Sequence, residues 1–141
     1  MKIIVDAFGG DNAPLEMIKG ARQAADEYGV QILLSGDREQ IESCAKHNSI
    51  DLTGMEILDA EGMIPVEADP TTLLKDYENC SMAVGMRALK DGQGDAFVSA
   101  GSTGAMVVGA SLVVKRLKGV RRTAIPTIIP NEKGCFMLID S

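Results

Sequence analysis

Short apolar runs alternate along this chain with longer segments in which apolar residues recur every three or four positions. Continuous runs of this length predict buried strands, which we expect at 2–6, 31–35, 55–58 and 95–99. The segments of helical period predict helices, which we expect at 14–28, after Gly36-Asp37, at 78–89 and at 103–117. Regular alternation of strand and helix predicts an α/β fold with a mostly parallel sheet and helices on both faces.

Three stretches qualify this pattern. Residues 61–74 contain two prolines and mixed charge without a clear period, so we expect an extended, partly irregular connection. Residues 103–117 are apolar nearly all round, which predicts a helix buried on more than one side. Apolar runs at 124–129 and 135–139 predict two further strands, joined by the polar loop 130–134.

A length of 141 residues suits one α/β domain with its own core, so we treat residues 1–141 as that domain. Hydrophobic residues make up 45% of the chain and aromatic residues only 4%, which predicts a core of aliphatic side chains and methionine. The chain stops directly after an apolar strand that we expect to be buried. Native domains rarely end there, so we expect a fragment of a longer protein.

The net charge of −6 argues against a general nucleic-acid-binding surface. One basic cluster is the exception, formed by Lys115, Arg116, Lys118, Arg121 and Arg122. Cations at this place suit the C-terminal end of the preceding helix and can simply be solvated. The cluster could instead form a surface for an anionic partner.

Neither the chain's beginning nor its cysteines suggest an extracellular protein. A charged residue and a strand directly follow Met1, so we expect no signal peptide, and the apolar stretch 105–114 is too short to span a bilayer. Cys44, Cys80 and Cys135 form neither a disulfide framework nor a metal-ligand pattern. We therefore expect a cytoplasmic protein without a metal site.

The stretch with the clearest chemistry is Ser99-Ala100-Gly101-Ser102-Thr103-Gly104-Ala105. It follows an expected strand and opens an expected helix, so it presents small side chains, hydroxyls and unpaired N–H groups at a helix N-terminus. Those groups suit a phosphate or a carboxylate. The alternative is an ordinary tight turn in which Ser102 or Thr103 caps the helix.

Polar residues also follow the other strands, and in a parallel sheet ligands bind beyond the carboxyl ends of the strands. We expect one edge to gather Asp6, Gly9-Gly10-Asp11, Gly36-Asp37, Asp59, 99–104 and Asp140-Ser141. Asp11 could cap the first helix, or it could orient a substrate hydroxyl or a cation. Asp6 could buttress its loop or face the ligand, and the pattern does not separate these two roles.

Other signatures are incomplete. The spacing of Gly104 and Gly109 matches a Walker A loop, but Ala110 stands where lysine is required, and Phe97 stands where a dinucleotide fingerprint needs its third glycine. We therefore expect no nucleotide cofactor. The single histidine, His47, falls at the end of an expected surface helix, and we assign no catalytic cysteine. Catalysis by positioning an anionic nucleophile remains.

Three segments resemble hallmarks of the bacterial phosphate acyltransferases of the PlsX family. They are MKIIVDAFGGDNAP at 1–14, SAGSTGA at 99–105, and RRTAI at 121–125 followed by LID at 138–140. The resemblance covers residues 1–141 and departs at Ser102, where many members have asparagine. A hydroxyl can replace an amide as a donor, but with a shorter reach.

The resemblance implies transfer of a fatty acyl group from acyl-acyl carrier protein to inorganic phosphate, forming acyl phosphate for phospholipid synthesis. It also implies a fold like the isocitrate and isopropylmalate dehydrogenases, a homodimer, and peripheral association with the inner membrane face. Family chains are well over twice as long, so this chain would be an inactive N-terminal portion. No cofactor is implied.

For substrate binding, phosphate or acyl, we single out Gly9, Gly10, Asp11, Ser99, Gly101, Ser102, Thr103 and Gly104. The sequence does not identify a catalytic residue. Two other readings stay open. One is a coenzyme A-dependent acyltransferase of the phosphotransacetylase kind, and the other is a non-enzymatic module that binds an anion.

Overall fold

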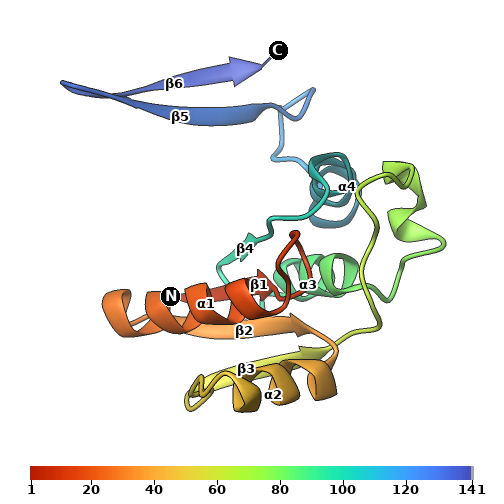
Figure 1. Ribbon diagram of the computed structural model, residues 1–141. Helices are drawn as coiled ribbons and strands as arrows, with labels where there is room; N and C mark the ends of the chain where they lie inside the picture. Colours follow the sequence, from red (N-terminus) through yellow and green to blue (C-terminus); the bar gives the residue numbers. More distant parts are fainter. Residues whose placement is uncertain (141) are drawn as a thin grey trace.

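The computed structural model describes residues 1–140 (Figure 1). Its elements are β1 (Lys2–Asp6), α1 (Leu15–Tyr28), β2 (Gln31–Gly36), α2 (Arg38–His47), β3 (Met55–Asp59), the 3₁₀ helix η1 (Pro70–Leu74), α3 (Ser81–Lys90), β4 (Ala96–Val98), α4 (Thr103–Gly109), the π-helical turn η2 (Ala110–Lys115), β5 (Ile125–Asn131) and β6 (Gly134–Asp140). Every expected strand is present, and every expected helix is present at least in part. The 3₁₀ helix inside the irregular connection 61–74 was not predicted.

The four-stranded sheet is parallel throughout, with the order β3-β2-β1-β4. Side chains alternate across it: Val5 and Leu34 belong to the cluster packed under α1 and α2, whereas Ile4 and Leu33 pack with Ala88 of α3. Helices therefore cover both faces, as the apolar pattern predicted. The strands are nearly continuous apolar runs because both faces are buried.

A second core lies beyond α3, where α4 and the connection containing η1 pack against it. Met82 and Met86 of α3 are buried there with Leu73 of η1 and Ala105 of α4. The approach of α3 to the sheet is close: a Cβ on Gly85 would lie 2.4 Å from Cε2 of Phe97 on β4. This packing fixes the N-terminus of α3 against the end of the sheet.

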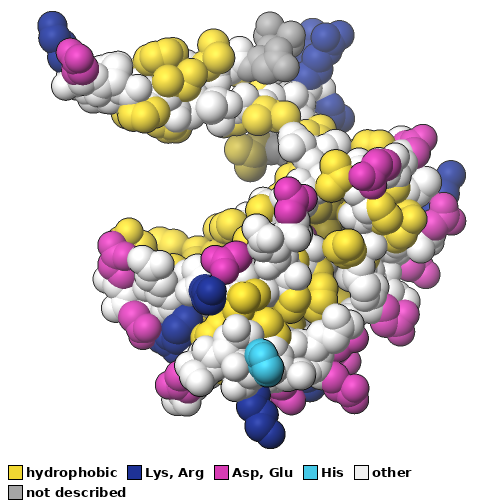
Figure 2. Space-filling view, in the orientation of Figure 1, with side chains coloured by type: hydrophobic (Ala, Val, Ile, Leu, Met, Phe, Trp, Pro, Cys, Tyr) yellow, Lys and Arg dark blue, Asp and Glu magenta, His cyan; other side chains and the backbone are white. Residues whose placement is uncertain are grey.

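The last two strands are the main correction to the sequence analysis. β5 and β6 pair with each other in antiparallel fashion and form a separate two-stranded sheet (Figure 1). Phe136, Met137, Leu138 and Ile139 are each more than half exposed, so the expected burial of this strand is wrong. Figure 2 shows apolar side chains along this hairpin. β5 and β6 are antiparallel because the connection between them is short, whereas joining two parallel strands requires a crossover of a dozen or more residues.

The expected helix at 103–117 forms only in part. α4 is α-helical to Gly109, and the chain continues as π-helix only to Lys115. Its buried positions, Ala105, Gly109 and Val113, recur every fourth residue, while Leu112 is 61% exposed. Among the described residues, this segment is therefore buried along one face, and the expectation of burial on more than one side is wrong.

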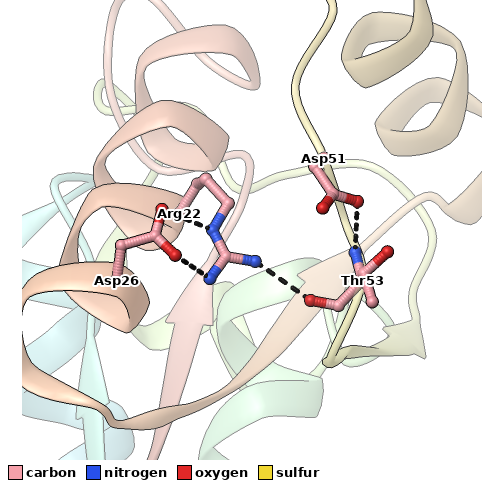
Figure 3. Close-up of polar contacts among 4 residues, drawn as sticks. All are labelled: Arg22, Asp26, Asp51 and Thr53. Carbon is pink, nitrogen blue, oxygen red and sulfur yellow. Dashed lines mark hydrogen bonds and ion pairs between the residues drawn. The ribbon is translucent and has the colours of Figure 1, made fainter.

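The side chain of Arg22 links α1 to the loop that precedes β3 through hydrogen bonds (Figure 3). Its Nε and Nη2 both donate to the carboxylate of Asp26, and its Nη1 donates to the carbonyl oxygen of Thr53 at 3.0 Å. Asp51 in turn accepts from the N–H of Thr53 at 2.9 Å. Exposed ion pairs contribute little free energy, so this contact chiefly sets the position of the loop.

Replacing Gly85 by alanine tests the close approach of α3. We expect Gly85→Ala to destabilise the fold by about 1–3 kcal/mol because the added methyl group meets the Phe97 ring. Gly20→Ala is the matched control, since Gly20 is also helical but, among residues 1–140, has nothing within 4 Å of its Cβ position. That variant should gain up to about 1 kcal/mol from helix propensity. Equal effects in urea unfolding would contradict this packing.

A second prediction concerns pH. Asp37 caps α2, and hydrogen bonds from the backbone and side chain of Gln40 hold the pKa of its carboxyl below the usual range. Because the folded pKa is lower than the unfolded one, this stabilisation is present at neutral pH and is lost as the pH falls below about 4. Asp37→Asn keeps a capping oxygen that does not titrate. The unchanged chain should therefore melt at a higher temperature than Asp37→Asn at pH 7, and this difference should become smaller at pH 3. A difference that stays constant would show that the Asp37 carboxylate does not stabilise the fold through its lowered pKa.

Candidate functional site

The site lies where two loops leave neighbouring strands. β1 pairs with β2 on one side and with β4 on the other, so the chain order reverses between β1 and β4. In open α/β sheets, ligands bind at the carboxyl ends of the strands at such a switch point. The loop after β1 carries Gly9-Gly10-Asp11, and the loop after β4 carries 99–102.

A buried carboxylate joins these two loops. Asp6, at the end of β1, is 1% exposed; its Oδ2 accepts from Oγ of Ser99 at 2.7 Å, and its Oδ1 accepts from the N–H of Phe8 at 3.1 Å. Ser99 Oγ also accepts from the N–H of Gly101 at 3.0 Å. Asp6 therefore buttresses the loop, which is one of the two roles left open for it, and it also lines the cavity beside the loop. The hydroxyl of Ser99 is engaged in the same network.

Gly9 is required by the close contact of the loops. A Cβ at this position would lie 2.5 Å from Oγ of Ser99, 2.6 Å from Oδ2 of Asp6 and 2.9 Å from the backbone nitrogen of Gly101. No side chain fits there without parting the loops. Gly10, the next residue, has a φ of 119°, a backbone conformation that favours glycine.

The two loops border a cavity of about 240 Å³. They contribute Gly9, Gly10, Asp11 and Gly101, and the lining also includes 63–67 and, at the start of α3, Ser81 and Met82. The lining contains the carboxylates of Asp6, Asp11 and Glu67 and, within the described part of the chain, no lysine or arginine. The cavity is therefore acidic, with apolar walls.

Ser102, Thr103 and Gly104 lie beside this cavity and do not line it. Ser102 is the N-cap of α4, and its Oγ accepts from the N–H of Ala105 at 3.3 Å. Gly104 packs against η1, where a Cβ would come within 2.6 Å of Cγ of Pro70. Among residues 1–140, the backbone N–H groups of all three have no hydrogen-bond acceptor. They leave three donors at the positive end of α4.

The other residues that we expected at this edge of the sheet have different positions or roles in the structure. Pro14, not Asp11, is the N-cap of α1, so the capping role considered for Asp11 is wrong, and Asp11 lines the cavity. Asp37 caps α2, and Asp59 accepts from the N–H of Arg38 at 3.0 Å, beside a separate hollow of about 670 Å³. Asp140 ends a strand of the separate hairpin, so its expected place at the sheet edge is wrong, and Ser141 lies outside the described residues.

The sequence analysis missed one wall of the cavity. Residues 63–67 belong to the stretch without period, and Ser81 begins a helix that we expected to start at 78. Nothing in the local sequence of 63–67 or around Ser81 indicates that these residues line a binding cavity. Their role arises only because the packing of α3 brings this segment to the end of the sheet.

Nucleophilic catalysis gains no support from nearby side chains. Burial raises the pKa of the Cys80 thiol, and the neighbouring Asp6 carboxylate raises it further, so this thiol stays protonated at neutral pH. His47 is exposed at the end of α2, as expected. No group of three potential metal ligands occurs among the described residues, and none of their helices is long and apolar enough to cross a membrane.

The comparisons with known proteins agree with one another. The model of a family described as fatty acid synthesis protein matches residues 1–141. A phosphate acyltransferase of Desulforamulus reducens is 42% identical over all of this chain and 42% of its own length, and one of Acetivibrio thermocellus is 41% identical with the same coverage. EutD phosphotransacetylase from Staphylococcus aureus superposes with a TM-score of 0.64 at 21% identity, over 99% of this chain and 44% of that one. This chain thus spans about two fifths of these relatives, and the solved structure shows a shared fold.

Removing the Asp6 carboxylate tests the junction of the loops. We expect Asp6→Ala to lower the free energy of unfolding by about 2–3 kcal/mol, because Ser99 Oγ and the Phe8 N–H lose a buried acceptor. Asp11→Asn is the control, since Asp11 is exposed and should change stability by less than about 0.5 kcal/mol. Similar small losses for both variants in chemical denaturation would show that Asp6 does not hold the loops together.

Proposed function

Because this chain belongs to the fatty acid synthesis protein family, we propose that it forms the N-terminal part of an acyltransferase. The complete enzyme would transfer a fatty acyl group from acyl-acyl carrier protein to inorganic phosphate. The acyl phosphate formed would feed phospholipid synthesis. The resemblance found in the sequence and the names of the relatives support this reaction. In this proposal, the present chain supplies the binding site for phosphate.

The observation that carries the proposal is the set of unpaired N–H groups on Ser102, Thr103 and Gly104. Backbone donors at the start of a helix suit an anion with several acceptor oxygens, such as phosphate. Gly101 precedes them and lines the acidic cavity, so phosphate on these donors would lie next to that cavity. The three carboxylates around the cavity disfavour phosphate inside it.

The reaction then needs no covalent intermediate on the protein. A phosphate oxygen attacks the thioester carbonyl carbon, forming a C–O bond, and the C–S bond breaks to release the thiolate of the carrier, which takes up a proton. Holding the phosphate beside the thioester supplies the rate enhancement of proximity, and hydrogen-bond donors stabilise the oxyanion of the tetrahedral intermediate. This agrees with the protonated state of Cys80 and with the distance of His47 along the chain from the two loops.

The complete protein would extend well beyond these residues. We propose that it is a cytoplasmic homodimer that associates peripherally with the inner membrane face, as the family resemblance implies. Since this chain spans 42% of the phosphate acyltransferases compared, we propose that the isolated chain binds phosphate without turnover. Formation of acyl phosphate by the isolated chain would contradict that part of the proposal.

Thr103→Pro tests the amide donors. Thr103 is the first residue of α4, where proline fits a helix, and the preceding Ser102 has an extended ψ of 115°. The substitution removes one N–H group, so phosphate affinity measured by NMR titration should fall by roughly tenfold. Thr103→Ala keeps the N–H group and is the matched control. Unchanged affinity in a folded Thr103→Pro variant would exclude this amide from the site.

The same pair of variants in the complete protein separates the candidate functions. Parallel loss of phosphate affinity and of acyl phosphate formation supports the enzyme, whereas loss of affinity alone indicates a module that only binds an anion. Assays with acyl-acyl carrier protein and with acyl-coenzyme A decide the donor. Preference for the coenzyme A thioester would favour a reaction of the phosphotransacetylase kind.

A further inference from the structure

Ser81 carries a buried hydroxyl group that forms no hydrogen bond within residues 1–140. The residue is 1% exposed, and among residues 1–140 its Oγ has no hydrogen-bond partner. Other serines near the site are engaged: Ser35 Oγ donates to the carbonyl oxygen of Ser81 at 2.7 Å, and Ser99 and Ser102 hold their own loops. Buried polar groups are nearly always paired in native proteins, so an unpaired one calls for an explanation.

The position of Ser81 supplies one. Ser81 is the first residue of α3 and lines the cavity together with Gly9, Gly10 and Gly101. Its own backbone is fixed, because its N–H donates to the carbonyl oxygen of Gly62 at 3.1 Å and its carbonyl accepts from Ser35. The backbone of Ser81 is thus fixed beside the cavity, and its Oγ is buried beneath the cavity surface. Contact with a molecule in the cavity would require rotation of this side chain about χ1.

The other lining residues restrict what that molecule can be. Phe8, Met63, Ile64 and Met82 give the cavity apolar walls, and its charged groups, Asp6, Asp11 and Glu67, are all acidic. An anion would be repelled there, whereas a neutral carbonyl group attached to methylenes would suit both the hydroxyl donor and the walls. The volume of about 240 Å³ has room for the head of an acyl chain and not for its whole length.

We propose that Ser81 donates a hydrogen bond to the carbonyl oxygen of the acyl thioester, whose first methylenes lie against Phe8 and Met82. This inference rests on the proposed function and assigns the second substrate to its own subsite. Gly101 connects the two subsites, because it lines the cavity and directly precedes the phosphate donors 102–104.

Thermal melting of the chain without ligand gives the first test. Ser81→Ala removes an unpaired buried hydroxyl, so its melting temperature should equal or exceed that of the unchanged chain. Ser35→Ala is the matched control, because it removes a paired buried hydroxyl and should lower the melting temperature by several degrees. A drop of the same size in Ser81→Ala would show that the hydroxyl has a structural partner and would overturn the proposal.

The second test titrates the chain with S-octanoyl-N-acetylcysteamine, a small acyl thioester, and separately with inorganic phosphate, both followed by NMR. Ser81→Ala should weaken thioester binding about fivefold to tenfold and leave phosphate affinity unchanged, and Thr103→Pro should show the opposite pattern. Ser43→Ala, at an exposed position of α2, should change neither.

Thioester binding that is absent in the unchanged chain, or equal in Ser81→Ala, would overturn the inference. Weaker phosphate binding in Ser81→Ala would also overturn it, because the cavity would then take the anion. Failure of the proposed function has a different signature. In that case the thioester still binds through Ser81, but the complete protein forms no acyl phosphate.

Discussion

The buried carboxylate of Asp6 is the contact on which the site depends. It accepts hydrogen bonds from the loop after β1 and from the loop after β4, through the N–H of Phe8 and the hydroxyl of Ser99. A buried carboxylate is costly unless its oxygens are satisfied, so the two loops are held where they satisfy it. The close approach of Gly9 to Gly101 follows from this arrangement, and with it the shape of the cavity wall.

Charge divides the space around Gly101 into two different environments. On one side the cavity presents carboxylates and apolar walls, and on the other the first turn of α4 presents unpaired backbone donors. Electrostatics would favour an anion at the first turn of α4 and a neutral acyl group in the cavity. A reaction that joins such a pair benefits from subsites that are adjacent but chemically distinct, since each substrate is then excluded from the place of the other.

The resemblance to a phosphotransacetylase concerns the fold, and a shared fold does not by itself fix the substrate. The family match is stronger because it spans residues 1–141. The exposed apolar hairpin β5–β6 is consistent with a chain that spans only two fifths of its relatives. A two-stranded sheet of this kind is only marginally stable without a packed face.

The sequence by itself determined the elements and their chemistry at the strand ends. Continuous apolar runs predicted the four parallel strands, and Gly29 and Asp37 marked helix ends. The turn at 99–105 predicted a helix capped by Ser102 or Thr103, and the structure assigns the cap to Ser102. These features are local, because period, capping and turn chemistry are set by residues a few positions apart. The convergence of Gly9, Gly10, Asp11 and Gly101 followed from a general rule of parallel sheets.

Only the tertiary structure decided which distant segments complete the site. The wall formed by 63–67 and Ser81 depends on how α3 packs against the sheet, and no local pattern encodes that contact. The exposure of the hairpin β5–β6 was equally beyond the apolar pattern, which marks a strand but not what covers it. Whether a hydroxyl is paired is likewise a property of the packed molecule, because each hydrogen bond is fixed by atoms far apart in the chain.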